Sequence, residues 1–387
     1  MATGFTATGS TVGSVESDIA QLDGSGPSVP LLAVTLGDPA GIGPEVVCKW
    51  LAQAATQQAL AAGEFRVTLV GTRKTWDLGL EVALGQLAQP QARDRTAALN
   101  ELLGIHGVGN HAAAAPLRLL DVELPLPEPF VYGAVDADCG RVAIASVEAA
   151  AELCLGGIAS AMVTAPINKA SVNAAGCADI GHQEMLARLA GVDWTATMLM
   201  TPGLRVAHLS THKSLARAVD YVSKETVLSK LQLLHQSLSG WGLAAPRIAV
   251  AALNPHGGEN GLLGREEIDE LAPAVVAARD AGVDAYGPIP ADSVFNRAID
   301  GEFDVVLALY HDQGHIAIKV HDFHNSVTAT LGIPFVRTSV DHGTAFDIAG
   351  RGVADATGMV AAVAAARALA TRRLADFQTM GHTQSTR

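Results

Sequence analysis

Aromatic residues are scarce in this sequence: Phe, Trp and Tyr make up 4% of its 387 residues, although apolar residues as a whole make up 49%. The core must therefore be built mainly from Ala, Val, Leu and Ile. Such a composition suits a parallel sheet buried beneath helices on both faces. At roughly 100–200 residues per domain, the length indicates two domains, or one large α/β unit with a second lobe.

Cysteines are also few, and none of them forms a CxxC pair. The four are Cys48, Cys139, Cys154 and Cys177. This spacing gives neither a disulfide framework nor a cysteine metal site, so we interpret the residues as free thiols in a reducing compartment. A catalyst that uses a thiol is not expected.

Positive charge is in deficit, since 26 Lys and Arg residues face 39 Asp and Glu residues and the formal net charge is −13. A nucleic-acid partner is not expected, because such binding normally needs a basic surplus or stripe. No apolar run approaches the roughly 18 residues that a membrane span needs. The N-terminus lacks a basic stretch followed by an apolar one, the mark of a secretory signal. We expect a cytoplasmic protein that binds neither membrane nor nucleic acid.

The chain falls into three segments by composition. Residues 1–28 are rich in Gly, Ser, Thr and Ala, which predicts a flexible extension. Residues 29–375 alternate between short apolar runs and amphipathic stretches and form the predicted two-lobed unit, with no clear boundary between the lobes. Residues 376–387 are predicted to be a loose C-terminal tail.

Six apolar runs each end in a polar turn rich in Gly, Pro or His. The runs cover residues 31–36, 161–165, 205–210, 247–253, 304–310 and 334–340. Helical stretches are predicted at about 141–156, 223–239, 265–281 and 354–372. Strands that alternate with helices predict βα units and a largely parallel α/β sheet. Ligands of such sheets bind beyond the carboxyl ends of the strands, so the polar turns indicate one binding cleft.

Three histidines, His212, His256 and His311, each follow a different predicted strand. Three imidazoles that converge on one cleft would form an open divalent-metal site. The alternative is three unrelated loop histidines that bond to backbone. Asp292 and Asp312 are candidates for carboxylates that orient these ligands or bind weakly, and Asp292 is one of two candidate catalytic residues.

The second candidate catalytic residue is Lys169, which follows the run at 161–165. A lysine in such a cleft can hold a phosphate or move a proton, although a solvated loop lysine is the alternative. Lys319 and Arg337 also flank the predicted cleft. Arg337 lies inside an apolar run, where a charge is costly without a partner. A bound phosphate or carboxylate would supply that partner, as would a buried ion pair.

Taken in order, these turns resemble the 4-hydroxythreonine-4-phosphate dehydrogenase family of vitamin B6 synthesis and its paralogues. The resemblance runs from about Leu31 to Ala370. Its motifs are GDPAGIGPE, TAPINK, GHQE, THKSL, NPHGGE, GPIPAD, YHDQG and RTSVDHGTAFDIAGRG. It implies the two-lobed α/β fold shared with isocitrate and isopropylmalate dehydrogenases, with a largely parallel sheet and an interlobe cleft. It also implies a homodimer with its active site at the subunit interface.

The resemblance assigns roles to individual residues. The family's metal ligands match His212, His256 and His311, and the metal is expected to be Zn²⁺, with Mg²⁺, Mn²⁺ or Co²⁺ as candidates. Its contacts to a small anionic substrate match His182, Lys319 and Arg337, and Gln183 and Thr328 are further candidate substrate contacts at positions where the residue differs. Its NAD-binding loop matches Asp341, His342, Gly343, Thr344, Asp347 and Ile348. NAD is expected over NADP, because Asp347 would repel a 2′-phosphate.

The implied reaction is oxidation of a secondary hydroxyl with hydride transfer to NAD, followed by decarboxylation of the β-keto acid. The metal would stabilise the developing alkoxide. The sequence departs from the vitamin B6 pattern at Gln183, which replaces a Thr, and at residues 324–328, where a Gly-Arg pair and an Asn are missing. His315 resembles the paralogues that act on four-carbon sugar-acid phosphates. We therefore expect a threonate or erythronate 4-phosphate to compete with the vitamin B6 intermediate as substrate.

Three other functions stay open at this point. HDQGHIAIK and GRGVADAT also resemble the cis-dihydrodiol dicarboxylate dehydrogenases of aromatic catabolism, which lack the arginine kept here as Arg337. A non-catalytic metabolite-binding protein on the same scaffold would not need all three histidines. An acyl transferase related to phosphotransacetylase would need none of them.

Overall fold

The computed structural model describes residues 29–85, 99, 115–179, 181–374 and 377. The chain divides into two compact units, Met1–Gly191 with Pro334–Arg367 and Val192–Ile333 with Ala368–Arg387. We refer to them as unit 1 and unit 2. The predicted extension at 1–28 lies outside the described residues, and so does the predicted tail at 376–387 apart from residue 377.

Unit 1 contains a parallel part of the sheet with strand order β3-β2-β1-β4-β11. Buried apolar side chains fill these strands, as the scarcity of aromatics predicts. Helix α6 packs against β1, β2 and β4, and α2 packs against α4. The strands are β1 (Leu31–Thr35), β2 (Arg66–Gly71), β3 (Leu117–Asp121), β4 (Ala161–Thr164) and β11 (Val336–Val340). The helices are α2 (Gly43–Leu51), α3 (Ala54–Ala61), α4 (Arg73–Leu84), α6 (Ala137–Leu155), α7 (Lys169–Ala174), α8 (His182–Ala190) and α14 (Thr357–Ala370), whose last turn belongs to unit 2.

Unit 2 contains strands in the order β10-β5-β6-β9-β7-β8. The β10–β5 and β5–β6 pairs are antiparallel, and the other pairs are parallel. The strands are β5 (Ala196–Thr201), β6 (Leu204–His208), β7 (Ile248–Ala251), β8 (Ala285–Ile289), β9 (Val305–Ala308) and β10 (Val327–Leu331). The helices are α9 (Leu215–Asp220), α10 (Lys224–Gly240), α11 (Ala272–Asp280), α12 (Ala291–Ile299) and α13 (His311–His321), with a tight turn η2 (Pro255–Gly261) and a π turn η3 (Glu267–Leu271).

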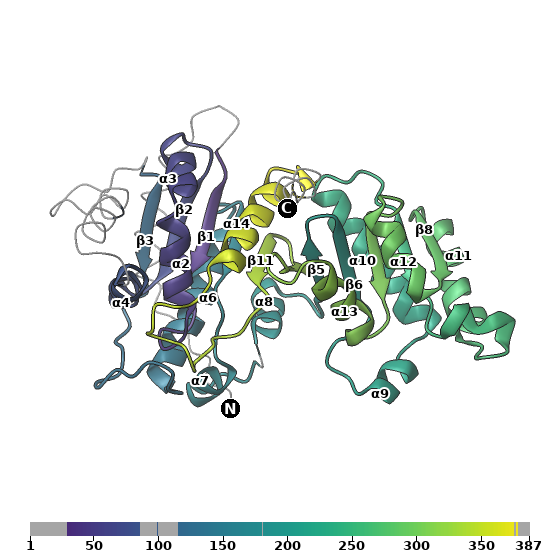
Figure 1. Cartoon of the computed structure of the whole chain (residues 1–387), viewed down its shortest axis with the longest axis horizontal. Helices are drawn as coiled ribbons and strands as arrows, with labels where there is room; N and C mark the ends of the chain where they lie inside the picture. The colour runs from purple at the N-terminus through teal and green to yellow at the C-terminus, as the bar shows by residue number, and fades with distance from the viewer. Residues whose placement is uncertain (1–28, 86–98, 100–114, 180, 375–376, 378–387) are drawn as a thin grey trace. The chain divides into compact units, whose positions relative to one another are not determined.

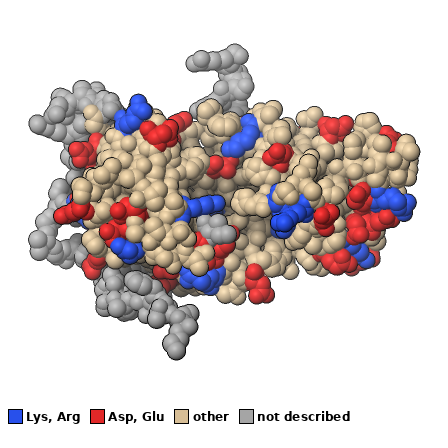
Figure 2. All heavy atoms as spheres, turned by 90° about the horizontal axis from the view of Figure 1, so that it is seen from below, with Lys and Arg blue, Asp and Glu red and all other residues tan. Residues whose placement is uncertain are grey.

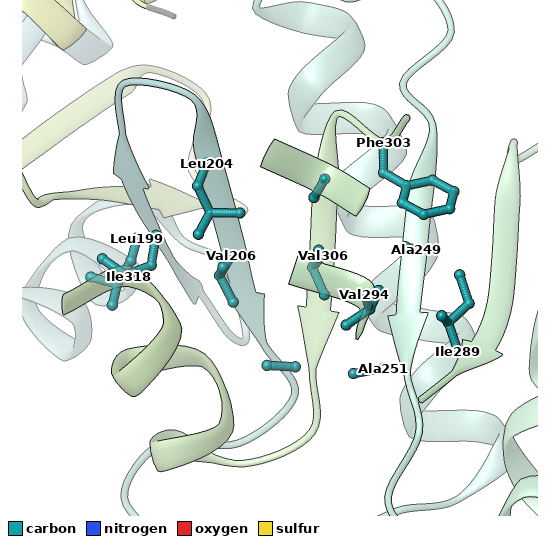
Figure 3. Packing of buried hydrophobic residues seen from close by; sticks show 12 residues of the cluster. Leu199, Leu204, Val206, Ala249, Ala251, Ile289, Val294, Phe303, Val306 and Ile318 are labelled. Carbon is teal, nitrogen blue, oxygen red and sulfur yellow. The ribbon is translucent and has the colours of Figure 1, made fainter. Parts of the chain in front are cut away.

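The core of unit 2 lies between its strands and helices α12 and α13. Ile318 of α13 lies beside Leu199 of β5, and Val294 of α12 packs into the same buried cluster (Figure 3). Ile318 and Val294 are fully buried. At about 25 cal/mol per Å² of apolar surface removed from water, such side chains each contribute roughly 1.5–3 kcal/mol. This packing holds α13, which begins at His311, against the strands of unit 2.

The predicted strands and the predicted α/β class are confirmed. The helix expected at 141–156 begins earlier, because the Asp136 side chain accepts hydrogen bonds from the backbone N–H groups of Asp138 and Cys139 and caps the helix there. Ser223 caps α10, in a reciprocal pair with Thr226. The helix expected at 265–281 is split into a π turn and α11.

All four cysteines are free, as expected. Burial raises the pKa of Cys139 and of Cys154 to about 12, so both thiols stay protonated at neutral pH. Within the described ranges, no helix has the length and apolar character to cross a membrane. Acidic and basic side chains are interspersed on the face of the molecule that Figure 2 shows.

Candidate functional site

The loops that follow β1, β4 and β11 meet at one edge of unit 1. The backbone N–H of Asp38 donates to Pro166 O at 3.0 Å, and the N–H of Ile42 donates to Thr344 O at 3.0 Å. A Cβ on Gly41 would lie 2.9 Å from the Thr344 Cβ, so the loops approach this closely only because residue 41 is glycine. The glycines of GDPAGIGPE therefore serve loop packing.

Arg337 lies in β11 next to β4, with 3% of its surface exposed. Its Nε and Nη2 atoms donate to the Thr164 hydroxyl at 3.1 and 2.5 Å. Burial lowers the pKa of Arg337 to about 9, which still leaves the guanidinium charged at neutral pH. The Thr164 hydroxyl thus fixes the position of the guanidinium beside β4.

His182 begins α8 and lies close enough to Arg337 to feel its charge. Burial and, next, the Arg337 cation hold the pKa of His182 well below its usual value. Its Nε2 atom is shielded from solvent and has no hydrogen-bond partner among the residues that the structure describes. A shielded neutral imidazole beside a guanidinium suits an anionic ligand, because both side chains can donate to it. Gln183 is the next residue of α8 and is partly exposed.

Lys169 extends from the loop after β4 toward the same region. Its Cε lies 3.7 Å from the Cβ position of Gly181, the residue before His182. The Asn168 side chain caps α7 by accepting hydrogen bonds from two backbone N–H groups of the helix. Its Nδ2 atom also donates to Thr344 Oγ1 at 3.5 Å. The structure thus brings the predicted residues Lys169, His182 and Arg337 to one edge of unit 1.

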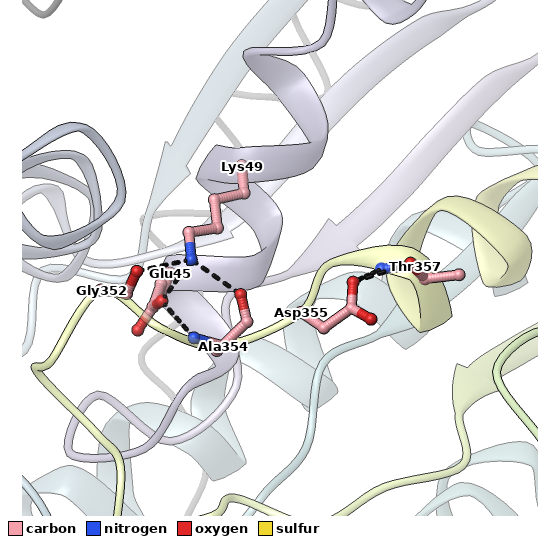
Figure 4. Close-up of polar contacts among 6 residues, drawn as sticks. All are labelled: Glu45, Lys49, Gly352, Ala354, Asp355 and Thr357. Atoms are coloured by element: carbon pink, nitrogen blue, oxygen red, sulfur yellow. Dashed lines mark hydrogen bonds and ion pairs between the residues drawn. The ribbon is translucent and has the colours of Figure 1, made fainter. Parts of the chain in front are cut away.

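The predicted NAD-binding residues Asp341–Ile348 form the loop after β11. Thr344 is buried, while His342, Gly343 and Asp347 are exposed. The following segment is fastened to α2: Lys49 Nζ donates to Gly352 O and Ala354 O at 2.9 and 2.7 Å and pairs with Glu45 at 2.7 Å (Figure 4). Glu45 also accepts from the Ala354 N–H at 2.8 Å. This tie fixes the position of the chain that follows the loop.

The three predicted metal ligands all lie in unit 2. They follow β6, β9 and β7, which are parallel neighbours in the sheet. His212 lies in the exposed turn after β6, His256 in η2 after β7, and His311 begins α13 directly after β9. Each histidine therefore stands at the same edge of the sheet, as the sequence predicts.

Two of these imidazoles have a carboxylate on Nδ1. His256 Nδ1 lies 2.8 Å from Glu259 Oε1, and His311 Nδ1 lies 2.6 Å from Asp312 Oδ1. A carboxylate on Nδ1 leaves Nε2 as the nitrogen for a metal, the arrangement typical of histidine ligands. Within the described ranges, no three His, Cys, Asp or Glu side chains are already gathered closely enough to hold an ion. The metal site therefore stays a prediction.

The backbone that carries His256 is strained. His256, Glu259 and Asn260 have φ values of 54°, 46° and 56°. Non-glycine residues in this left-handed region cost roughly 1–2 kcal/mol each. The buried Glu267 holds the chain before the turn, because its Oε1 accepts from the N–H groups of Leu253 and Asn254 at 2.8 and 2.7 Å. Strain that is held in this way is typical of functional loops.

Gln313 bridges two segments of the candidate site, and the sequence analysis missed it. Its Nε2 donates to Ala252 O at 2.8 Å, and its Oε1 accepts from the Leu309 N–H at 2.7 Å, both in the interior. This amide joins the start of α13 to the loop before His256. The YHDQG motif contains this Gln, but the sequence does not show which two segments the side chain joins.

Three further predicted site residues lie elsewhere in unit 2: Asp292 in α12, Lys319 in α13 and Thr328 in β10. Asp292 is exposed in the first turn of α12, which packs against η2. The Lys319 Nζ lies 4.9 Å from the centre of the Phe323 ring. Thr328 lies in β10 opposite Leu199 of β5.

The model of one protein family, described as pyridoxal phosphate biosynthetic protein PdxA, matches residues 63–366. That match spans more than half of the chain. The chain belongs to the PdxA family.

Similar proteins match 88% of this chain. The D-threonate 4-phosphate dehydrogenase of Salmonella typhimurium is 41% identical over 88% of this chain and 98% of its own length. The 4-hydroxythreonine-4-phosphate dehydrogenase of Geobacter metallireducens is 40% identical over 88% of this chain and 96% of its own length. A crystal structure of 4-hydroxythreonine-4-phosphate dehydrogenase from Klebsiella pneumoniae is similar with a TM-score of 0.75 and 38% identity, covering 88% of this chain and 99% of that one. The resemblance drawn from the motifs is confirmed.

Proposed function

We propose that this PdxA-family chain is a metal-dependent, NAD-linked dehydrogenase of a phosphorylated hydroxy-acid with four carbons, such as D-threonate 4-phosphate. The observation that carries the proposal is the meeting of Arg337, His182 and Lys169 at one edge of unit 1. Charge-assisted hydrogen bonds from a guanidinium recognise phosphate and carboxylate strongly. The substrate's anionic end is therefore assigned to Arg337 and His182.

The donor set of unit 2 fits a divalent metal. Three imidazoles at neighbouring strand ends would hold it, two of them oriented by Glu259 and Asp312. When bound, such an ion supplies Lewis-acid stabilisation of the charge that develops on the substrate oxygen. Imidazole ligands suit Zn²⁺, with Mg²⁺, Mn²⁺ and Co²⁺ as alternatives.

The protein's own side chains account for the other requirements of the reaction. Lys169 is assigned the transfer of a proton at the substrate hydroxyl, with Asp292 as a second candidate in unit 2. The loop Asp341–Ile348 is assigned to NAD, which supplies the hydride acceptor when bound. Asp347 favours NAD over NADP because a carboxylate repels a 2′-phosphate. Decarboxylation of the β-keto acid product, a homodimeric assembly and a cytoplasmic location complete the proposal.

Two features favour threonate or erythronate 4-phosphate over 4-hydroxythreonine 4-phosphate. Gln183, Asn325 and Thr328 replace polar groups of the vitamin B6 pattern, and losing a buried polar contact to a substrate typically costs a few kcal/mol. Relatives at 38–41% identity are named D-threonate 4-phosphate dehydrogenases. Relatives that share 40% identity carry the vitamin B6 name, so identity alone does not decide the substrate.

The test is NADH formation with D-threonate 4-phosphate, D-erythronate 4-phosphate, 4-hydroxythreonine 4-phosphate and a non-phosphorylated cis-dihydrodiol dicarboxylate. We expect the highest kcat/KM with D-threonate 4-phosphate or D-erythronate 4-phosphate, and loss of turnover in a chelator. A clear preference for 4-hydroxythreonine 4-phosphate would show that the three replacements are neutral. A preference for the cyclic diol would show that Arg337 does not serve a phosphate, and equal use of NADP would overturn the role of Asp347.

A further inference from the structure

A histidine is buried in the core of unit 2 at the end of β6. His208 has 2% of its surface exposed, and its Nδ1 atom is shielded and has no hydrogen-bond partner among the described residues. Burying a polar group without a full set of partners costs roughly 1–3 kcal/mol. A core selected for stability alone would favour an aliphatic residue at this position, so the imidazole must have another role.

The other ring nitrogen of His208 contacts a second histidine. His208 Nε2 lies 3.1 Å from His315 Nδ1, and His315 Nδ1 also lies 3.1 Å from the backbone oxygen of His311. A carbonyl oxygen only accepts hydrogen bonds, so we assign the proton of this cluster to His315 Nδ1 and a lone pair to His208 Nε2. The two contacts together fix both the position and the tautomer of the His315 ring.

The ring of His315 in turn covers the ring of His311. The two residues are four apart on α13, and their ring centroids are 3.6 Å apart with an angle of 11° between the planes. His311 is thus held on its face by His315 and at its edge by Asp312. We call His208, His315 and His311 the histidine stack.

The close approach of α13 to β6 depends on Gly314. A Cβ at this position would overlap the His208 Nε2 atom and lie 2.8 Å from Val206 Cγ1. The glycine between His311 and His315 therefore makes room for the buried imidazole. This gives a way to disturb the stack without altering any ionisable group.

We propose that His208 and His315 are positioning residues that lock the ring of His311 and thereby tighten the binding of a divalent metal. The inference rests on the proposed function, which gives His311 its role as a ligand. Groups that orient a metal-binding histidine typically change metal affinity by about 10-fold to 100-fold. His208 is buried at the end of β6, so we expect its side chain to act on the His311 ring mainly through His315.

The experiment measures Co²⁺ affinity of the full chain by visible absorption in competition with a chelator, and the thermal midpoint of the metal-free protein. For His208→Leu we expect affinity to fall about 10-fold to 100-fold, with an unchanged or raised thermal midpoint because an unsatisfied polar group leaves the core. His208→Gln, whose amide can replace Nε2, should restore part of the affinity. The double variant His208→Leu/His315→Leu should be no worse than His315→Leu, since the two act in series.

His235→Leu is the matched control. His235 lies in α10 of the same unit, and its Nδ1 is likewise shielded and unpartnered among the described residues. Its loss should leave Co²⁺ affinity unchanged. If His208→Leu fails to fold, Gly314→Ala displaces the same ring and should weaken Co²⁺ binding similarly.

The outcomes separate the inference from the proposed function. If His311→Ala keeps wild-type Co²⁺ affinity, the proposed metal site is wrong. If His311→Ala loses the metal while His208→Leu and Gly314→Ala bind it as the wild type does, only the positioning role is overturned. Equal losses in His208→Leu and His235→Leu would also overturn it, because any imidazole with a shielded nitrogen would then have the same effect.

Discussion

The charge on Arg337 is buried in β11 and bonded to the Thr164 hydroxyl, which makes this side chain the sharpest test of substrate binding. We predict that Arg337→Met lowers kcat/KM for a phosphorylated substrate about 100-fold to 1,000-fold, roughly 3–4 kcal/mol. The KM for NAD should change little. Steady-state kinetics with each substrate varied in turn measure both.

Arg205 provides the control for Arg337. It is an equally buried arginine of β6, and it donates to the backbone oxygens of Asp304 and Leu374 at 2.9 and 3.3 Å. Arg205→Met should lower stability in denaturant and leave the KM for the substrate unchanged. A similar rise in KM in both variants would mean that Arg337 acts only through the fold.

His182 predicts a pH dependence of stability. Its pKa in the folded chain lies well below the unfolded value of about 6.5. Below pH 6.5 the unfolded chain therefore binds a proton that the folded chain does not, and stability falls as pH falls. The loss is about 1.4 kcal/mol per pH unit while the folded histidine stays neutral. His182→Gln should flatten the decline of the unfolding free energy between pH 6.5 and 5 in urea titrations. An unchanged slope would contradict the assignment.

At the scale of elements, Gln313 joins α13 to the loop before His256. We predict that Gln313→Leu lowers the unfolding free energy of the metal-free protein by about 2–3 kcal/mol, since a buried N–H and a buried C=O lose their partner. It should also weaken metal binding, because the bridge ties His311 to the chain of His256. Val320→Gln, at an exposed position of the same helix, should change stability by less than about 0.5 kcal/mol. Chemical denaturation in chelator is the measurement, and equal effects of the two would refute the bridging role.

The tie between α2 and the chain after the NAD loop makes a second prediction for elements (Figure 4). Lys49→Met leaves Glu45, 2% exposed, without its cation and frees the oxygens of Gly352 and Ala354. We expect a loss of about 2 kcal/mol, below the range for fully buried pairs because Lys49 is 23% exposed. The NAD dissociation constant should rise while Co²⁺ affinity stays the same. The double variant Glu45→Gln/Lys49→Met should recover part of the stability, and no recovery would mean that the ion pair is not the cause.

Strands and helices with strong patterns could be predicted from the sequence, whereas their exact starts and partners could not. The run at 304–310 predicted β9, and the stretch at 223–239 predicted α10. The first turn of α6, Ala137–Gly140, was missed, and only the bonds that the Asp136 side chain accepts from the backbone show that the helix begins there. The antiparallel strands β5 and β10 were not predicted, since the strand order depends on long-range pairing rather than on local pattern.

The candidate site shows the same limit at the scale of the whole molecule. Motif order placed His212, His256 and His311 at strand ends and placed Arg337 inside an apolar run. It did not find Gln313, Glu267 or His208, because each acts through a contact with a distant segment. The sequence RVAHLS predicts only a strand that contains His208, whereas the partner of this side chain, His315, lies 107 residues further along the chain.

The division of the chain into two units leads to a prediction for the whole molecule. All three predicted metal ligands lie in unit 2, whereas Arg337, His182 and the predicted NAD loop lie in unit 1. A ligand stabilises the segments that bind it by mass action, so Zn²⁺ and NAD should protect different parts of the chain from hydrogen exchange. Zn²⁺ should slow exchange in 209–213, 252–261 and 309–315, and NAD should slow it in 341–348.

The variants make this prediction specific. In His256→Ala the protection by Zn²⁺ should disappear from unit 2 while the protection by NAD in 341–348 persists. In Lys49→Met the protection by NAD in 341–348 should weaken while the protection by Zn²⁺ in unit 2 persists. The reason is that this variant loosens only the chain that follows the NAD loop. Protection by Zn²⁺ that survives His256→Ala would place the metal elsewhere. Protection by NAD confined to unit 2 would contradict the assignment of Asp341–Ile348, whatever the substrate proves to be.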